Sequence, residues 1–180
     1  MTYTIRPVRA HEWREIRALR LEALRDEVAP IAFLDSYADA QTRSDEFWQG
    51  RAAGSSSDAG QEATARQFVA VDGSGEWVGN SVVLIEKPGE VDFEGKTIEE
   101  AGGHIVGVYL RPEHRGRGLL QELFEAALGW MRERGLPQAR LYVHANNLRA
   151  RRAYEKAGFQ PTGNTFRSPA GDEIEMARSL

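Results

Sequence analysis

The sequence of 180 residues contains no cysteine. This absence excludes disulfides, thiolate metal sites and a cysteine nucleophile, and it leaves the redox compartment undetermined. Any group transfer that the chain catalyses must avoid a cysteine-bound intermediate.

Long apolar runs and a basic excess are also missing. No run approaches the roughly 18 apolar residues that a membrane span needs, and residues 1–6 lack the apolar core of a signal peptide. We therefore expect a cytoplasmic protein without a membrane partner. The net charge of −4 argues against general nucleic-acid binding. The arginine-rich stretch 140–152 favours it, but no interleaved aromatic residues supply stacking platforms there.

The composition that remains, 41% hydrophobic and 28% charged residues, is typical of a folded protein. We expect one compact domain over residues 1–180. Residues 31–42 break the helical periodicity and are expected to form a loop, and residues 54–60 read as a flexible surface linker. The predicted elements are a strand (3–8), two helices (11–26 and from 44), a hairpin (68–71 and 77–85), a strand (105–110), a helix (to 131), a strand (140–144), a helix (147–157) and a final hairpin (165–178). This order predicts a mixed α/β or α+β sheet with helices on both faces.

The segment 105–131 carries the strongest functional signal. Its apolar start predicts a buried strand, and apolar residues at helical spacing follow. Between them, Arg115-Gly116-Arg117-Gly118 predicts a tight turn into the helix N-terminus. Unpaired backbone N–H groups and the positive end of the helix dipole at such a turn suit a polyphosphate.

Two common phosphate-binding motifs do not fit this turn. An NTPase loop needs a Gly-Lys-Ser/Thr ending, which is missing here. The dinucleotide fingerprint needs a third glycine where Gln121 stands, and it lacks its first-strand context.

Several blocks of the chain instead resemble the GNAT superfamily of N-acetyltransferases. The central motif of that family matches Arg115-Gly116-Arg117-Gly118-Leu119-Leu120, with Leu110-Arg111-Pro112 before it. Downstream, Asn147-Leu148-Arg149-Ala150 and Tyr154-Glu155-Lys156-Ala157-Gly158-Phe159 resemble its second conserved block. Thr4-Ile5-Arg6-Pro7-Val8 resembles its first strand. The resemblance implies a central sheet that is mixed and mostly antiparallel, and acetyl-CoA as cofactor.

The resemblance also implies where the cofactor binds. The pyrophosphate would lie on the N–H groups of the glycine-rich turn, and the pantetheine arm would pair with the strand before it, where Gly107 would permit a bulge. Asn147 would contact the same arm, and one arginine among Arg149, Arg151 and Arg152 would meet the phosphates. The implied cofactor-binding residues are Val108, Tyr109, Leu110, Arg115, Gly116, Arg117, Gly118, Leu119, Leu120 and Asn147.

One residue departs from the family motif. Leu120 stands where the family has a small residue, which lets the backbone or the helix approach closely. Leu120 lies on the apolar stripe of the helix, so we expect its side chain to turn into the core.

The resemblance implies Tyr154 as the general acid. A phenol with a pKa of about 10 is protonated at neutral pH and can donate a proton to the departing thiolate. Glu86 and His104 are the candidates for the base. Each of these residues also has a purely structural reading, as a core aromatic, a solvated strand-end carboxylate and a strand residue respectively.

The predicted function is direct transfer of the acetyl group of acetyl-CoA to a primary amine of a small molecule or a peptide N-terminus. The acidic connection 87–103 hints at a cationic acceptor. The alternative is a catalytically silent module that binds acyl-CoA as a sensor. The sequence leaves open whether the protein forms a homodimer.

Overall fold

The computed structural model describes residues 2–180 and contains a seven-stranded sheet with the order β1-β2-β3-β4-β5-β7-β6. All neighbouring strands are antiparallel except β4 and β5, which are parallel. The sheet is therefore mixed and mostly antiparallel, as the family resemblance implies. The strands are β1 (Thr4–Pro7), β2 (Ala65–Val71), β3 (Trp77–Glu86), β4 (Gly102–Leu110), β5 (Gln138–His144), β6 (Gln160–Ser168) and β7 (Gly171–Ser179).

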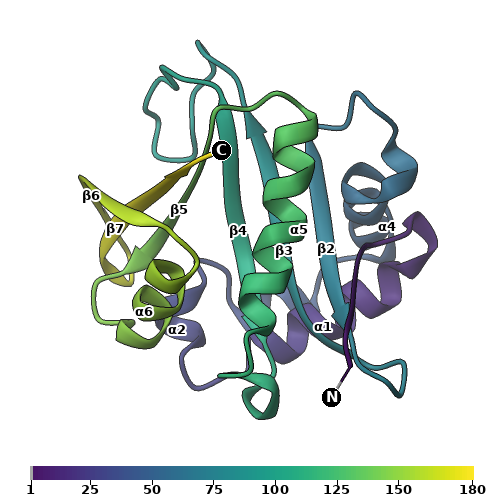
Figure 1. Cartoon of the computed structure of the whole chain (residues 1–180). Helices are drawn as coiled ribbons and strands as arrows, with labels where there is room; N and C mark the ends of the chain where they lie inside the picture. The colour runs from purple at the N-terminus through teal and green to yellow at the C-terminus, as the bar shows by residue number, and fades with distance from the viewer. Residues whose placement is uncertain (1) are drawn as a thin grey trace.

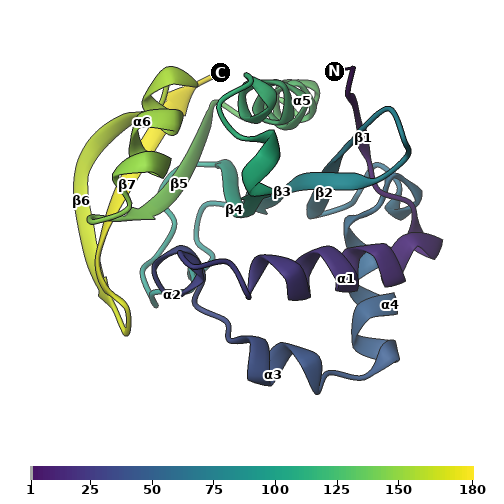
Figure 2. The ribbon, with the colours of Figure 1, turned by 90° about the horizontal axis from the view of Figure 1, so that it is seen from below.

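Helices cover both faces of this sheet (Figures 1 and 2). Helices α5 and α6 lie on one face, and α1 to α4 lie on the other. Three short 3-10 helices add to them at Ala10–Glu12, Ser57–Ala59 and Pro112–His114. None of the helices within residues 2–180 is long and apolar enough to cross a membrane. The α-helices are α1 (Trp13–Ala23), α2 (Ala29–Ala32), α3 (Tyr37–Gln41), α4 (Asp45–Ser55), α5 (Leu119–Glu133) and α6 (Leu148–Lys156).

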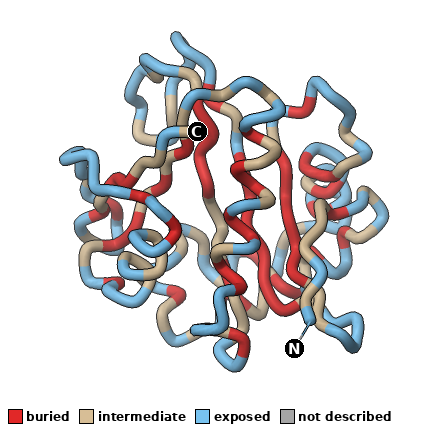
Figure 3. The backbone as a smooth tube through the Cα atoms, viewed as in Figure 1, coloured by how far each residue is buried: buried red, intermediate tan, exposed pale blue. Residues whose placement is uncertain are grey.

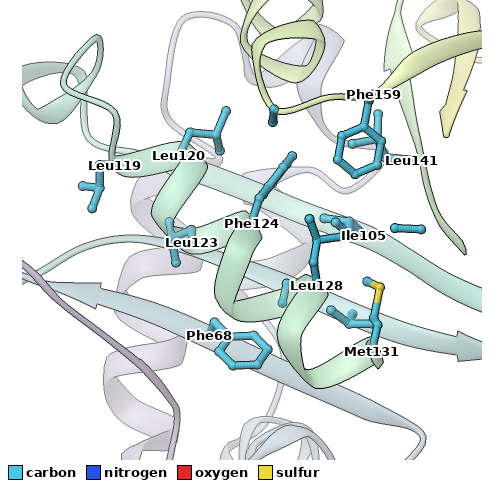
Figure 4. Packing of buried hydrophobic residues seen from close by; sticks show 14 of the residues in the cluster. Phe68, Ile105, Leu119, Leu120, Leu123, Phe124, Leu128, Met131, Leu141 and Phe159 are labelled. Atoms are coloured by element: carbon cyan, nitrogen blue, oxygen red, sulfur yellow. The ribbon is translucent and has the colours of Figure 1, made fainter. Parts of the chain in front are cut away.

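Helix α5 supplies the centre of the main core (Figures 3 and 4). The apolar stripe predicted from its spacing is buried on the sheet, with Leu123, Phe124 and Leu128 fully inaccessible. Leu120 turns into the same core and is only 9% exposed, which confirms the expectation for this motif position. Burying each such side chain contributes about 1.5–3 kcal/mol to folding.

Two segments differ from the sequence-based expectation. Residues 31–42, expected to be a loop, contain the end of α2 and all of α3, which Ser36 caps by accepting the N–H of Asp39. Residues 54–60, expected to be a flexible linker, are instead ordered, because α4 continues to Ser55 and Ser56 is fully buried. Helices α2 and α3 are too short for a periodic pattern to reveal them.

Strand β4 contains a bulge at Gly107. The register against β3 passes from Asn80↔Tyr109 to Val82↔Val106, so β4 holds one extra residue. Gly107 has a φ of +61°, in the left-handed region that glycine adopts without strain. Because one extra residue reverses the alternation of side chains, Tyr109 packs against α1, on the sheet face opposite to Ile105.

Strands β4 and β5 pair only where they begin. Their register contains two pairs, Gly103↔Ala139 and His104↔Arg140. Beyond His104 the two strands separate, and no strand within residues 2–180 pairs with β4 on that side. The bulge bends β4 and increases its twist at the point where the seam opens.

We expect Gly107→Ala to destabilise the protein by about 1–2 kcal/mol, the usual cost of holding a side chain in the left-handed region. An added Cβ would meet only Val82 Cγ2 at 3.8 Å, so the cost is conformational and not steric. Gly129→Ala in the middle of α5 is the matched control, because its Cβ would enter open space. That control should stabilise the protein by about 0.5–1 kcal/mol. Urea unfolding of both variants measures the difference, and equal stabilities would contradict the bulge argument.

Candidate functional site: a cleft between β4 and β5

The separation of β4 from β5 opens a cleft of about 880 Å³ that is lined from both faces of the sheet. On one face its walls come from the glycine-rich turn, the start of α5 and helix α6. On the other face they come from α2 and the residue that follows it, Phe33, together with side chains of β5 and β7. Two molecules entering from opposite faces would meet between the strands.

The glycine-rich turn presents free backbone donors to this cleft. Gly116 and Gly118 have φ values of +73° and +82°, and Gly118 is the N-cap of α5. Among the described residues, no acceptor receives the N–H groups of Gly116, Gly118, Leu119 or Leu120. These donors lie at the positive end of the α5 dipole, which is a suitable geometry for a phosphate.

The Arg115 side chain holds the turn in place. Its Nε donates to the carbonyl oxygen of Leu110 at 2.9 Å, and its Nη2 donates to Asp26 Oδ2 at 2.5 Å. The turn is thereby tied both to the end of β4 and to the segment between α1 and α2. Arg115 lines the cleft, but its guanidinium is already paired.

The N–H group of Leu110 faces the gap. Arg111 donates its N–H to the carbonyl of Val78, and Leu110 is opposite Gly79. Hydrogen-bonded and non-bonded pairs alternate along antiparallel strands, and Leu110 and Gly79 form a non-bonded pair. The N–H and C=O groups of Leu110 therefore point away from β3. Val108, Tyr109 and Leu110 all line the cleft.

Asn147 and several cations of α6 complete the same side. Asn147 caps α6 by accepting the N–H of Ala150 with Oδ1, which leaves the amide nitrogen for the cleft. Arg149, Arg152 and Lys156 line the cleft. Arg151 instead donates to the carbonyl of Ala145, so its head group is directed elsewhere.

Tyr154 lines the cleft from helix α6. Its ring stacks on Phe124 with a centroid distance of 5.6 Å. No described residue hydrogen-bonds its hydroxyl, and burial raises its pKa to about 12. The phenol is therefore held as a proton donor at neutral pH.

Two other arginines of the motif region lie outside the cleft lining. Arg111 forms ion pairs with Glu22 and Glu76 on the α1 side. Arg117 is exposed and does not line the cleft, whereas the other three residues of the turn 115–118 do.

A family model for the acetyltransferase (GNAT) family matches residues 13–159, most of the chain. The chain belongs to the GNAT acetyltransferase family. The sequence resemblance is therefore confirmed, and the predicted cofactor-binding residues other than Arg117 lie together in the cleft of a GNAT protein.

Individual relatives match over limited stretches. The mycothiol acetyltransferase of Beutenbergia cavernae is 41% identical over 66 residues, which is 37% of this chain and 22% of the relative. That of Thermobispora bispora is 47% identical over 64 residues, 34% of this chain and 22% of the relative. The chain thus spans about a fifth of the length of these curated relatives.

Solved structures agree over nearly the whole fold. The GNAT superfamily phosphinothricin acetyltransferase of Sinorhizobium meliloti, solved in complex with AcCoA, has a TM-score of 0.72 at 18% identity, covering 100% of this chain and 89% of that one. The ribosomal-protein-S5-alanine acetyltransferase of Vibrio fischeri has a TM-score of 0.73 at 18% identity, covering 99% and 93%. At such low identity these similarities show a shared GNAT fold.

The two residues predicted as bases lie at the closed end of the seam and not in the cleft lining. Glu86 is bound by Arg140 through contacts of 2.5 and 2.6 Å, and His104 Nδ1 lies 3.4 Å from Glu86 Oε1. Although burial opposes it, hydrogen bonds from His104 and Arg140 lower the pKa of Glu86 to about 2. A carboxylate this acidic and already paired is a weak proton acceptor.

Two carboxylates of the acidic connection 87–103 point inward. Asp92 binds Arg140, and Glu94 accepts a hydrogen bond from the Tyr142 hydroxyl at 2.9 Å. Both carboxylate side chains are almost fully buried, with exposed fractions of 6% and 5%. Neither lines the cleft, so the connection gives no direct support to a cationic acceptor.

The sequence analysis did not single out His144 at the end of β5 or Glu173 on β7, and both line the cleft. They are opposite each other in the β5–β7 register. The alternation of the final strand places Glu173 and Glu175 on one face, but nothing in the local sequence separates a cleft carboxylate from one in an ion network.

We expect Glu86→Gln to lower the free energy of unfolding at pH 7 by about 3 kcal/mol, because it leaves Arg140 with less compensation in a buried site. The native pKa of Glu86 lies below its ordinary value of 4.5, so this stabilisation is present above about pH 4.5 and is lost as the pH falls toward 2. Denaturant unfolding between pH 2 and pH 7 measures the effect. Exposed Glu62→Gln is the control, and an equal loss in both variants would contradict a structural role for Glu86.

Proposed function

We propose that this GNAT protein is an acetyl-CoA-dependent N-acetyltransferase, and that residues 1–180 form one acetyltransferase domain. The observation that carries the proposal is the early separation of β4 from β5 beside a turn with free N–H donors. An acyl-CoA has a pyrophosphate for the turn and amide groups for the unpaired edge of β4. A plain strand–turn–helix would need neither feature.

The donor enters from the face of α5 and α6. Its pyrophosphate lies on the N–H groups of residues 116 and 118–120, with cations of α6 beside it. The pantetheine arm runs along Val108 and Leu110 as an added strand, and the Asn147 amide contacts the same arm. The thioester then reaches the gap between the strands.

Transfer requires stabilisation of the oxyanion and a proton for the leaving thiolate. The Leu110 N–H faces the gap and can donate to the developing oxyanion. Tyr154 supplies the proton to the sulfur. Since the chain has no cysteine, the amine attacks the thioester directly and no thiol-bound intermediate forms.

The acceptor enters from the opposite face, past Ile31, Ala32 and Phe33. We propose a primary amine of a small molecule or a peptide N-terminus. Relatives of this fold include the spermidine N-acetyltransferase of Vibrio cholerae, solved with CoA and spermine.

The cofactor claim is tested by calorimetry. Acetyl-CoA should bind at micromolar protein concentration, and Gly118→Ala should weaken binding because its φ of +82° sets the turn. Gly129→Ala on α5 should bind normally. No heat of binding with the wild-type protein would refute the proposed cofactor.

The acid claim is tested by Tyr154→Phe. We expect kcat to fall about 100-fold, in the range typical of a lost general acid, while the KM for acetyl-CoA is unchanged. Thermal stability should be unaltered, because no described residue bonds the hydroxyl and the ring can still stack on Phe124. Release of CoA thiol across an amine library gives both constants, with Tyr37→Phe outside the cleft as control. Full turnover by Tyr154→Phe would remove this role, and binding without turnover by the wild type would indicate a sensor.

A further inference from the structure

Glu173 occupies the acceptor side of the cleft. It lies on β7 opposite His144 of β5, where the seam between β4 and β5 is open. Its residue exposure is 8%, and it lines the cleft that also contains Tyr154. It is thus a nearly buried carboxylate that faces the route proposed for the amine.

One oxygen of this carboxylate is held and the other is open. Oε1 accepts a hydrogen bond from Ser168 Oγ at 3.0 Å, and Ser168 Oγ in turn accepts the N–H of Ala170 at 3.1 Å. No described residue donates a hydrogen bond to Oε2. The protein does not fully enclose this atom. Oε2 is therefore accessible from the cleft.

Glu175, two residues further along the same strand face, shows the opposite environment. Its carboxylate accepts from Thr162, Asn164 and Arg140, and it does not line the cleft. Although burial opposes it, these contacts lower its pKa. The pKa of Glu173 is raised, because burial outweighs the hydrogen bond from Ser168 and the influence of His144.

No cation neutralises Glu173 among the described residues. His144 accepts the N–H of Asn146 with Nδ1, so Nε2 carries the proton and donates to the carbonyl of Ala170 at 2.9 Å. These two contacts fix the orientation of the imidazole. Adjacent Asp172 is paired with Arg167. The other charged groups of the cleft are Asp26 and Arg115, paired with each other, and Arg149, Arg152 and Lys156 of α6.

We infer that Glu173 is the catalytic base, and that its Oε2 takes the proton from the acceptor ammonium group. This inference rests on the proposed acetyl transfer. A largely buried carboxylate that is held at Oε1 by Ser168 and has no counter-ion can attract an ammonium group and accept its proton at Oε2.

The proton balance is complete with the groups on the two sides of the gap. Glu173 removes one proton from the ammonium, and the nitrogen lone pair forms the C–N bond to the thioester carbonyl carbon. As the C–S bond breaks, its electron pair leaves with sulfur, which takes the proton of Tyr154. The second nitrogen proton restores the Tyr154 phenol, and Glu173 releases its proton to solvent.

The test is the pH dependence of kcat/KM with an amine found in the library screen. In the wild type, the acid limb should follow the protonation of Glu173. Glu173→Gln should lower kcat/KM about 100-fold and abolish that limb, while the KM for acetyl-CoA is unchanged. Ser168→Ala removes a bond that favours the carboxylate, so it should move the limb to higher pH.

Glu175→Gln is the matched control, because it removes a buried carboxylate of the same strand face and should leave the acid limb in place. Carbon NMR titration of the Glu173 carboxyl gives a readout that does not need turnover, and its pKa should lie above the ordinary glutamate value of 4.5. An active wild type with an unchanged profile in Glu173→Gln, or an ordinary or lower carboxyl pKa, would overturn the role of Glu173 alone. Absence of turnover by the wild type with every amine would remove the proposed function and this inference together.

Discussion

The pairing of β4 with β5 is the constraint on which the other features of the site depend. Two parallel strands with a regular ladder would satisfy each other's backbone groups and leave no space between them. Here the ladder stops after two pairs, and the bulge at Gly107 bends β4 just beyond that point. The same bulge turns Tyr109 toward α1 and directs the Leu110 N–H into the gap. One left-handed glycine therefore determines both the shape of the opening and the donors at its edge.

The closed end of the seam depends on a different interaction. Arg140 on β5 binds Glu86 of β3, Glu175 of β7 and Asp92 of the connection before β4. This arginine joins strands on both sides of the β4–β5 pair and one long connection with buried ion pairs. Ion pairs of Arg140 hold β4 and β5 together where the two strands begin, and the bulge at Gly107 lies where they separate. These two features set the depth of the cleft.

The long elements and the glycine-rich turn could be predicted from the sequence because their signals are local. The stripe on α5 follows from spacing, and the turn at residues 115–118 follows from its glycines. The short helices α2 and α3 span four and five residues and give no periodic signal. The base could not be assigned because Glu86, Glu173 and Glu175 look alike in the sequence. Only the positions of Arg140 and Ser168 in three dimensions distinguish a paired carboxylate from an available one.

The division of the sheet at its seam has a consequence for the mechanics of the molecule. Strands β1 to β4 form one half-sheet and β5 to β7 the other, and on the sheet itself they share only two backbone pairs. A pantetheine arm lying along β4 would connect these two halves of the sheet only while the cofactor is bound. Local opening of the β5–β7–β6 half would then differ between the free and the loaded protein, since an opening event in the loaded protein must also break contacts with the ligand. Amide hydrogen exchange in β5 and β7 would thus report cofactor occupancy at a distance from the phosphate-binding turn.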